Sequence, residues 1–543
     1  MVFARRSTTL LAAIIASCAM VLSLTACTSD NKTVVDGQTT VTSNSAGGVA
    51  VFTPSDGITL NQQTPLNKWA KLVPDLAKAL ADAGFKKGDI DHTTSDSLDK
   101  QSRAIQDFVV DHLSNNTTDD SGIAIAPDNM TLLVAPVVEA DASTRQYGDY
   151  VSQNLSTNDV TDEGATSDGE SSEDDSSKDD SSNTESDSTA SDEQAQAVDR
   201  LVSSLKLAKE SGMHVVLLGN SIEGYKPDAF VKFSDAQTIG KLQAEKMVSK
   251  LKLDKASKDN PKYIEVLLPY TAVDEKGNAN DSTFAQEAFR GIWQVLGSYY
   301  QKGVVESPSG TLDGKSTEND WQAVAYDAAK EGSTAKVLDK RLAKTDGQST
   351  LTRIDGIITM NDYIASEVVK ELDDLGYTGS AADINPQITI SGIVGNITGK
   401  KDLSRDAVPD PIKSPENDNA NDSSSSDDDA DEDTSASDKD RDSQWPLVTG
   451  YGAYVSNIPS IVNGKQWMTG MEDRQTIATD IAQACAKLNK DEALNSMPSI
   501  RNSEVGGVKK IPTISEPLLA VSASNLKSAL IDPGYISLAD AGL

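Results

Sequence analysis

The residues that most often carry metal, thiol or nucleophilic chemistry are scarce in this chain of 543 residues. It has three cysteines and three histidines, His92, His112 and His214, and none of the histidines lies in a recognisable catalytic-triad context. No Gly-x-Ser-x-Gly segment occurs, and nothing pairs two carboxylates as a glycosidase requires. We therefore expect no metal site, no cofactor and no catalytic residue, and an exported hydrolase is the weakest functional hypothesis.

Polar loops that follow buried strands are better candidates for a binding function. In open α/β sheets, ligands lie outside the carboxyl ends of the strands, so the loops at those ends are where function is expected. The loops that meet this condition are Pro136–Ala142, Gly219–Gly224, Pro269–Asn280, Asn361–Asp362 and Gly450–Ala453.

The elements that position these loops alternate between buried strands and amphipathic helices. Apolar runs predict strands at 49–53, 130–137, 214–218, 263–268 and 354–360. Apolar residues at helical spacing predict helices at 65–83, 98–113, 194–211, 234–251, 284–299, 320–330 and 362–375, the last ended by Gly376. This alternation is typical of an α/β fold with parallel sheets. About 450 foldable residues favour two lobes over one very large sheet.

The net charge of −34 is concentrated in two segments. Residues 156–193 contain 14 acidic residues and one Lys, and residues 414–443 contain 12 acidic and two basic residues. Such Ser- and Asp-rich segments bury too little apolar surface to fold, so we predict two disordered inserts. Calcium binding by the Asp runs is an alternative, but EF-hand spacing is absent. The acidic chain also argues against nucleic acid and against anionic lipid surfaces as partners.

The N-terminus has the organisation of a secretion signal. Arg5 and Arg6 precede an uncharged apolar stretch, Leu10 to Leu24, that is too short to be a convincing membrane span. Leu24-Thr25-Ala26-Cys27 resembles the lipobox of bacterial lipoproteins. That resemblance implies a signal over 1–26, lipidation of Cys27, a polar tether over 27–48 and an extracytoplasmic location with lipid as the only membrane anchor. An ordinary signal with an incidental Cys is the alternative.

The remaining cysteines allow no intramolecular disulfide. Cys18 leaves with the signal and Cys27 is lipidated, so only Cys485 stays available. Cys485 lies in a helical apolar pattern and is expected to be buried and inert.

Six segments in the same order resemble periplasmic-type sugar-binding proteins of ABC transporters, with most similarity to the xylose and multiple-sugar branch. They are Leu132–Val137, His214–Asn220, Phe230–Gly240, Ile354–Ala365, Trp445–Thr469 and Pro517–Tyr535. The resemblance covers about residues 49–540 without the inserts. It implies two Rossmann-like lobes joined by three crossings, as in type I periplasmic binding proteins, with the ligand between them. By that model the first lobe takes 49–220 plus 470–500, and the second takes 221–469 plus 501–540.

The same resemblance implies a set of ligand-binding residues, with departures from the family's pattern. It assigns hydrogen bonding to Asn220, Asn361, Asp362 and Lys68, and ring stacking to Trp69, Trp321 and Tyr451. Gly219-Asn220 replaces the family's Asp-Arg pair, and Tyr451-Gly452 replaces its Gln-Asp pair. Buried sugar hydroxyls need partners, so the loss of these charges argues that the ligand is no ordinary free monosaccharide, or that affinity has been lost.

Each of these residues also has a purely structural interpretation. Asp362 begins a predicted helix, where Asp is a common N-cap. Trp69 and Trp321 lie in helical patterns and are candidates for core packing, and Asn220 beside Gly219 is typical of a turn. Tyr451 lies between two glycines, which favours the binding site over the core.

Two functional hypotheses follow. The first is a lipid-anchored solute-binding protein that captures a small polar ligand, a sugar or sugar derivative, for an ABC permease. The second is a sensor or interaction lipoprotein that has the same fold and a degenerate sugar pocket.

Overall fold

The computed structural model describes part of the chain. The described residues are 33–35, 38–40, 46–55, 65–115, 125–138, 142–156, 185–273, 280–328, 330–343, 351–381 and 445–543. Strands β1 (Thr33–Val35) and β2 (Gln38–Thr40) pair antiparallel, and residues 46–543 form a separate compact unit. The predicted signal, Cys27, residues 157–184 and the insert 414–443 lie outside the described residues, so the predictions made for them stay predictions.

The first large sheet has seven strands in the order β17-β18-β9-β7-β5-β3-β4. All neighbours run parallel except the hairpin β17–β18. The strands are β3 (Gly48–Pro54), β4 (Ile90–Ser95), β5 (Met130–Val134), β7 (His214–Leu218), β9 (Ala229–Lys232), β17 (Ile500–Val505) and β18 (Val508–Ser515). Every residue of β5 is buried, as expected for a strand covered on both faces.

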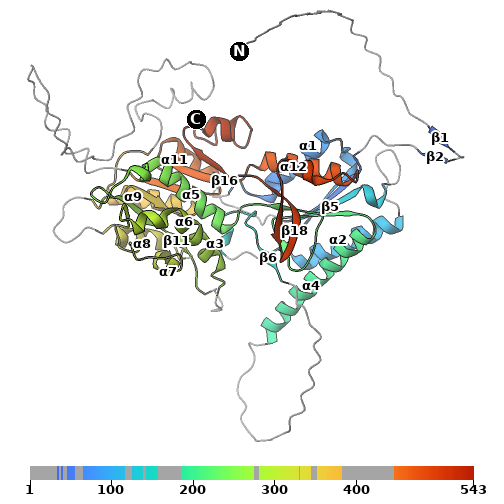
Figure 1. Cartoon of the computed structure of the whole chain (residues 1–543), viewed down its shortest axis with the longest axis horizontal. Coiled ribbons are helices and arrows are strands. Elements are labelled where there is room, and N and C mark those ends of the chain that lie inside the picture. Colours follow the sequence, from blue (N-terminus) through green and yellow to red (C-terminus); the bar gives the residue numbers. More distant parts are fainter. Residues whose placement is uncertain are drawn as a thin grey trace, which may run out of the picture. The chain divides into compact units, whose positions relative to one another are not determined.

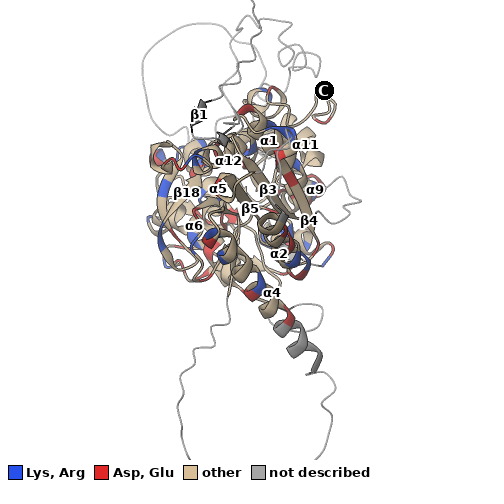
Figure 2. Ribbon diagram, turned by 90° about the vertical axis from the view of Figure 1, so that its right-hand side faces the viewer, with Lys and Arg blue, Asp and Glu red and all other residues tan. Residues whose placement is uncertain are grey.

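Helices cover both faces of this sheet (Figure 1). Helices α1 (Trp69–Asp82) and α12 (Arg474–Leu488) pack on one face, where the side chains of Val49 and Val51 point. Helices α2 (Leu98–Asn115) and α4 (Glu185–Glu210) pack on the other, and Figure 2 shows them side by side. Alternate residues of one strand therefore enter opposite cores, as the pleat requires.

The second sheet has six strands in the order β12-β10-β14-β15-β16-β19, parallel except for β16–β19. The strands are β10 (Lys262–Val266), β12 (Val305–Glu306), β14 (Gly356–Ile358), β15 (Leu447–Tyr451), β16 (Met468–Met471) and β19 (Leu519–Ser522). Its helices are α5 (Ala236–Leu251), α6 (Thr283–Gln301), α8 (Ser333–Arg341), α9 (Asp362–Leu375) and α11 (Ile458–Val462). The predicted α/β class with two parallel-dominated sheets is confirmed.

Helices α5 and α6 approach each other closely through two glycines. A Cβ at Gly240 would lie 2.2 Å from the carbonyl oxygen of Ala288, and a Cβ at Gly291 would lie 2.0 Å from that of Gln237. Both distances are far shorter than any van der Waals contact, so this helix pair requires glycine at both positions.

Shorter elements complete the described chain. They are α3 (Ala142–Arg145), α7 (Trp321–Val324), the parallel pair β6 (Asn154–Leu155) with β8 (Ser221–Ile222), and the parallel pair β11 (Leu268–Pro269) with β13 (Ala325–Tyr326). Short 3-10 turns lie at Lys87–Asp89, Pro127–Asn129, Leu253–Lys255, Val455–Asn457 and Leu494–Ser496, and a π-helical turn lies at Lys527–Ile531.

The chain passes three times between the two sheets and their helices, which we call the first and second halves. Phe233–Asp235 lead from β9 to α5, which packs on the second sheet. Glu472–Asp473 lead from β16 back to α12, and Glu516–Leu518 lead from β18 to β19. These are the three crossings that the resemblance implied.

The structure corrects several sequence-based boundaries. β9 and the hairpin β17–β18 belong to the first sheet, although the lobe model put 221–232 and 501–515 in the second lobe. The hairpin turns at Gly506 and Gly507, whose φ values of +55° and +77° suit a two-residue turn, and β18 then adds in parallel beside β9. The division of the whole chain into lobes stays a prediction.

Two helix predictions also need correction. Helix α4 begins at Glu185, inside the segment predicted to be disordered, although residues 185–192 are mostly Ser, Asp and Thr, which have low helix propensity; its packing on the first sheet begins at Ala197. The helix predicted at 320–330 is the single turn α7 followed by β13, since residues 325–326 pair with β11. Helix α8 was not predicted.

Candidate functional site

Most of the predicted ligand-binding residues meet one short segment of the chain, Gln146–Gln153, which we call the bridging segment. It lies between α3 and β6, and its residues bond or pack against both halves.

Lys68 and Trp69 stand at the start of α1 and contact Asp149 of the bridging segment. The Nζ atom of Lys68 lies 2.8 Å from Asp149 Oδ1, and the backbone N–H of Trp69 donates to Asp149 Oδ2 at 3.1 Å. The Trp69 side chain is buried, and its ring forms a T-shaped pair with the ring of Tyr150, with centroids 5.1 Å apart. The Tyr150 hydroxyl donates to the carbonyl oxygen of Lys68 at 2.5 Å. The Asp149 carboxylate thus binds the polar groups at the start of α1, and the Tyr150 ring packs against the Trp69 ring there.

Asn220 follows β7, at the carboxyl end of the first sheet. Its Oδ1 accepts from the backbone N–H of Gln153 at 3.0 Å, and its Nδ2 donates to the carbonyl oxygen of Pro136 at 2.9 Å. The side chain is buried, and both ends of its amide are bonded to backbone. Asn220 therefore anchors the bridging segment to the loop that follows β5.

Asn361 follows β14, at the carboxyl end of the second sheet. It is the N-cap of α9, where its Oδ1 accepts from the backbone N–H of Ile364 at 2.9 Å. Its Nδ2 donates to Gln146 Oε1 at 3.0 Å. Asn361 therefore caps the helix and binds the bridging segment with the two ends of one amide.

Asp362 is a buried acceptor inside the second half. Its Oδ1 accepts from Gln466 Nε2 at 2.7 Å, and its Oδ2 accepts from the backbone N–H of Tyr454 at 2.9 Å and from Thr469 Oγ1 at 2.8 Å. Burial raises the pKa of Asp362 to about 6, although these donors oppose the rise. Asp362 orders the loop after β15 rather than capping the helix, because Asn361 takes the N-cap position.

Tyr451 ends β15 and reaches the crossings between the halves. Its hydroxyl is hydrogen-bonded to Ser234 Oγ in the crossing after β9, and it lies 3.5 Å from Glu472 Oε1 in the crossing after β16. Glu472 Oε1 also accepts from the backbone N–H of Ser234 at 2.6 Å. Burial raises the pKa of the Glu472 carboxyl to about 7. Tyr451, Ser234 and Glu472 thus connect two of the crossings to the carboxyl end of β15.

The aromatic residues of the bridging segment enter opposite cores. Tyr147 belongs to the core of the second half, with its ring centroid 4.7 Å from that of Phe284 and 6.3 Å from that of Tyr451. Tyr150 belongs to the core of the first half and stacks on Phe233 with centroids 4.7 Å apart. Both side chains are almost completely buried, so the segment is part of both halves.

Sequence reasoning missed the bridging segment as well as Ser234 and Glu472. The signal that marks the segment is the run Gln-Tyr-Gly-Asp-Tyr at 146–150, where two tyrosines stand among polar residues in a loop after a buried strand. Trp321 was placed in this site by the resemblance. It lies on α7 in the core of the second half, edge-on to Tyr270 at 5.2 Å, and is not among the residues that bond the segment in the described part of the chain.

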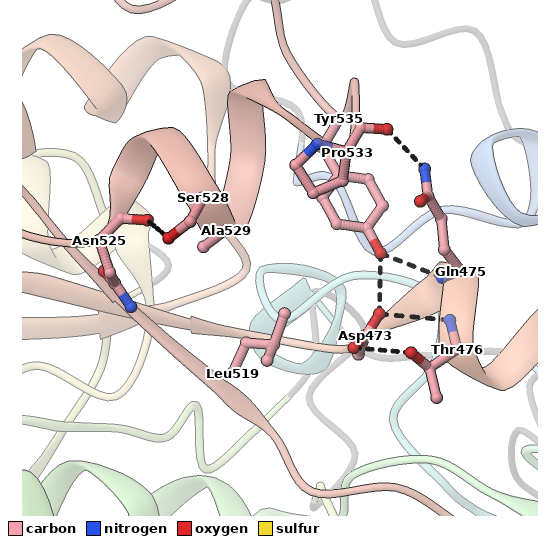
Figure 3. Close-up of a pocket in the computed structure, with 9 residues that line it drawn as sticks. All are labelled: Asp473, Gln475, Thr476, Leu519, Asn525, Ser528, Ala529, Pro533 and Tyr535. Carbon is pink, nitrogen blue, oxygen red and sulfur yellow. Dashed lines mark hydrogen bonds between the residues drawn. The ribbon is translucent and has the colours of Figure 1, made fainter. Parts of the chain in front are cut away.

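The structure also contains a pocket of about 430 Å³ that none of the predicted residues lines (Figure 3). Asp473, the N-cap of α12, accepts there from the Tyr535 hydroxyl at 3.0 Å and from Thr476 Oγ1 at 2.8 Å, and Gln475 Nε2 donates to the Pro533 carbonyl oxygen at 2.8 Å. The other lining residues are Leu519, Asn525, Ser528 and Ala529. The side chains of Asp473, Thr476 and Tyr535 thus hydrogen-bond to one another, and that of Gln475 bonds to the backbone of Pro533.

Cys485 is fully buried in α12, as predicted, and burial raises the pKa of its thiol far above the usual range.

No group of three or more His, Cys, Asp or Glu residues could hold a metal ion in the described part of the chain. Within those same residues, no helix is long and apolar enough to cross a membrane.

Comparison with protein-family models finds no match, and neither does comparison with curated proteins. Several solved structures are similar to this chain at low sequence identity. An ABC transporter solute-binding protein from Clostridium phytofermentans, with bound beta-D-glucose, is 17% identical, with 91% of this chain and 99% of that chain covered and a TM-score of 0.44. A carbohydrate transporter solute-binding protein from Chloroflexus aurantiacus, in complex with D-glucose, is 18% identical, with 92% and 98% covered and a TM-score of 0.42.

A periplasmic ribose ABC transporter protein from Conexibacter woesei is 14% identical, with 90% of this chain and 96% of that chain covered and a TM-score of 0.42. All three descriptions name transporter proteins, and two of them record a bound glucose.

Proposed function

We propose that this chain is an extracytoplasmic solute-binding protein, anchored through a lipidated Cys27, that takes a small polar ligand between its two halves and presents it to an ABC permease. The observation that carries the proposal is the position of Asn220 and Asn361. Each follows a strand at the carboxyl end of a different parallel sheet, and both bond the same eight-residue segment between the halves. Carboxyl ends of parallel strands are where α/β proteins bind ligands.

The chemistry of this junction suits recognition of a polar molecule with an apolar face. Amide groups accept and donate in the same side chain, Lys68 supplies a cation, and Trp69 and Tyr451 supply ring surfaces. A sugar or sugar derivative has this combination of hydroxyls and C–H faces. No bond of the ligand needs to break, because preferential binding to the closed arrangement of the halves is sufficient for delivery.

A second candidate function is a sensor or interaction lipoprotein with the same fold. The observation that favours it is that the binding groups of the junction already have partners within the chain: Lys68 binds Asp149, Asn220 binds Gln153 and Asn361 binds Gln146. A protein of this kind would present its surface to a membrane partner without capturing a solute.

Isothermal titration calorimetry with a panel of monosaccharides and amino sugars separates the two functions. The purified full chain is titrated beside the variant Asn220→Ala, which loses the side chain at the end of the first sheet. Solute binding predicts a heat signal for at least one sugar, with an affinity that Asn220→Ala changes at least about tenfold, because the substitution removes both a candidate ligand group and an anchor of the bridging segment. No heat with any sugar, for the wild type and for a variant whose bridging segment is released, would contradict solute capture and support the second candidate.

A further inference from the structure

We propose that the bridging segment Gln146–Gln153 is the resident ligand of the junction, so that a free solute can bind only after this segment leaves. The inference rests on the proposed function in one respect, that the solute and the segment share one site. It goes beyond that function because it names the occupant and makes its release the step that controls binding.

The polar groups of the segment take the places that sugar hydroxyls would need. The carboxylate of Asp149 receives both the ammonium of Lys68 and the backbone N–H of Trp69. In the second half, Asn361 donates to the side-chain Oε1 of Gln146. The Tyr454 hydroxyl donates to the backbone carbonyl oxygen of Gln146 at 2.7 Å. A solute that bound these same groups would have to replace each of these partners, since a buried polar group without a partner is costly.

The tyrosine rings of the segment contact the aromatic residues that were predicted to stack on a sugar. Tyr150 packs edge to face with Trp69 and stacks on Phe233, while Tyr147 packs against Phe284 and Tyr451. The aromatic rings that the sequence analysis assigned to sugar stacking at Trp69 and Tyr451 therefore already contact tyrosine side chains of the same chain.

The segment also fixes the two halves against each other. Its backbone is bonded to the first half and to a crossing: Asp149 N–H donates to the Asn67 carbonyl oxygen at 2.8 Å, and Ser152 N–H donates to that of Ser234 at 3.3 Å. Its side chains reach the second half through Gln146 and Tyr147. In hinged binding proteins the ligand closes the two lobes by contacting both, and here a segment of the chain makes both sets of contacts.

The local structure around the segment is compatible with its release. The segment follows α3, a helix of four residues, and precedes β6, a strand of two residues. Within the described chain, β6 pairs only with the two residues of β8. No strand of either large sheet includes the segment. Release of the segment therefore breaks no strand pairing of a main sheet, and its cost is the exposure of the buried Tyr147 and Tyr150 side chains.

Gly148 gives a variant directed at this segment. Its φ is +97°, and a Cβ there would lie 2.6 Å from the Asn67 carbonyl oxygen and 2.8 Å from Asn67 Cβ. Gly148→Ala should push the segment away from Asn67, which precedes α1. Gly376→Ala is the matched control, because Gly376 has a φ of +91° at the end of α9 but no atom within 4 Å of the added Cβ. The control has the backbone strain without the clash.

Hydrogen exchange of the full chain, measured by mass spectrometry, tests the occupancy. The amides of Asp149, Ser152 and Gln153 should exchange at least about 100-fold more slowly than in an unstructured peptide, and Gly148→Ala should accelerate them at least about tenfold while Gly376→Ala does not. Fast exchange of these amides in the wild type would overturn the inference. If Gly148→Ala does not fold, Asp149→Asn, which removes only the charge bound by Lys68, should show the same acceleration.

Titration with D-glucose and D-xylose tests the link between release and binding. We expect that Gly148→Ala binds at least one of them at least about tenfold more tightly than the wild type, because the wild type must first release its own ligand. Binding to the wild type with the segment still protected from exchange would overturn the inference. Protection in the wild type and release in the variant, without binding of either sugar, would support the resident segment and count against the proposed sugar function.

Discussion

The buried carboxyl of Glu472 makes a testable contribution to the pH dependence of stability. Its pKa rises from 4.5 to about 7 because the folded chain buries it between two crossings. The folded state therefore holds the proton more tightly than the unfolded state. The stability that this group contributes is complete below about pH 4.5 and is lost as the pH rises to about 7, a difference of about 3 kcal/mol.

Glu472→Gln should remove this dependence. Gln is neutral at every pH and keeps an Oε1 acceptor for the Ser234 N–H. Relative to the wild type, the variant should be unchanged to within about 1 kcal/mol near pH 4 and more stable by about 3 kcal/mol near pH 8.5. Urea unfolding followed by tryptophan fluorescence at both pH values measures the difference, and other titrating groups cancel because both proteins are compared at one pH. A difference that is the same at both pH values would refute the reasoning.

Three further predictions concern the cap, the helix contact and the anchor. Asn361→Ala should lower the free energy of unfolding by about 1–2 kcal/mol through loss of the α9 cap, while Asn361→Ser, which keeps a neutral cap acceptor, should lower it less; thermal unfolding that ranks the two variants the other way would count against the cap. Gly240→Ala should cost about 2 kcal/mol or more because its Cβ meets the backbone of α6, whereas Gly314→Ala, with no neighbour closer than 3.5 Å, should be nearly neutral in urea unfolding, and equal costs would contradict the close contact. Cys27→Ala should abolish incorporation of labelled palmitate and move the protein out of the detergent phase on partitioning, and retained label would exclude lipidation at this residue.

Much of the fold follows from local patterns in the sequence. The strand at His214–Leu218 and the helix at Asp362–Leu375 are found at the predicted residues, because a short buried run and a capped, glycine-terminated amphipathic pattern are local features. The helix expected at 320–330 was wrong because Ala325–Tyr326 pair with β11, a distant strand that the local pattern does not reveal.

The candidate site was predictable only in part. The loops that hold Asn220 and Asn361 were singled out because they follow buried strands, and that rule depends on fold class alone, while the binding role of the two residues stays a prediction. The partners of these residues were not found, because the bridging segment belongs to no regular strand of the sheets and matches no part of the family pattern. Glu472 was missed for a different reason: an acidic residue between a strand and a helix looks exposed in sequence, and only the tertiary structure buries it.

The distance between the two halves in solution tests most directly whether they are closed on a segment of their own chain. Spin labels at Asp107→Cys on α2 and Glu318→Cys in the second half occupy exposed positions. The background carries Cys18→Ser and Cys27→Ser, and the native Cys485 is buried and should stay unlabelled. Pulsed electron paramagnetic resonance without any sugar should give one narrow distance distribution for the wild type and an additional, shifted population for Gly148→Ala. A wild-type distribution as broad as that of the variant would contradict the account.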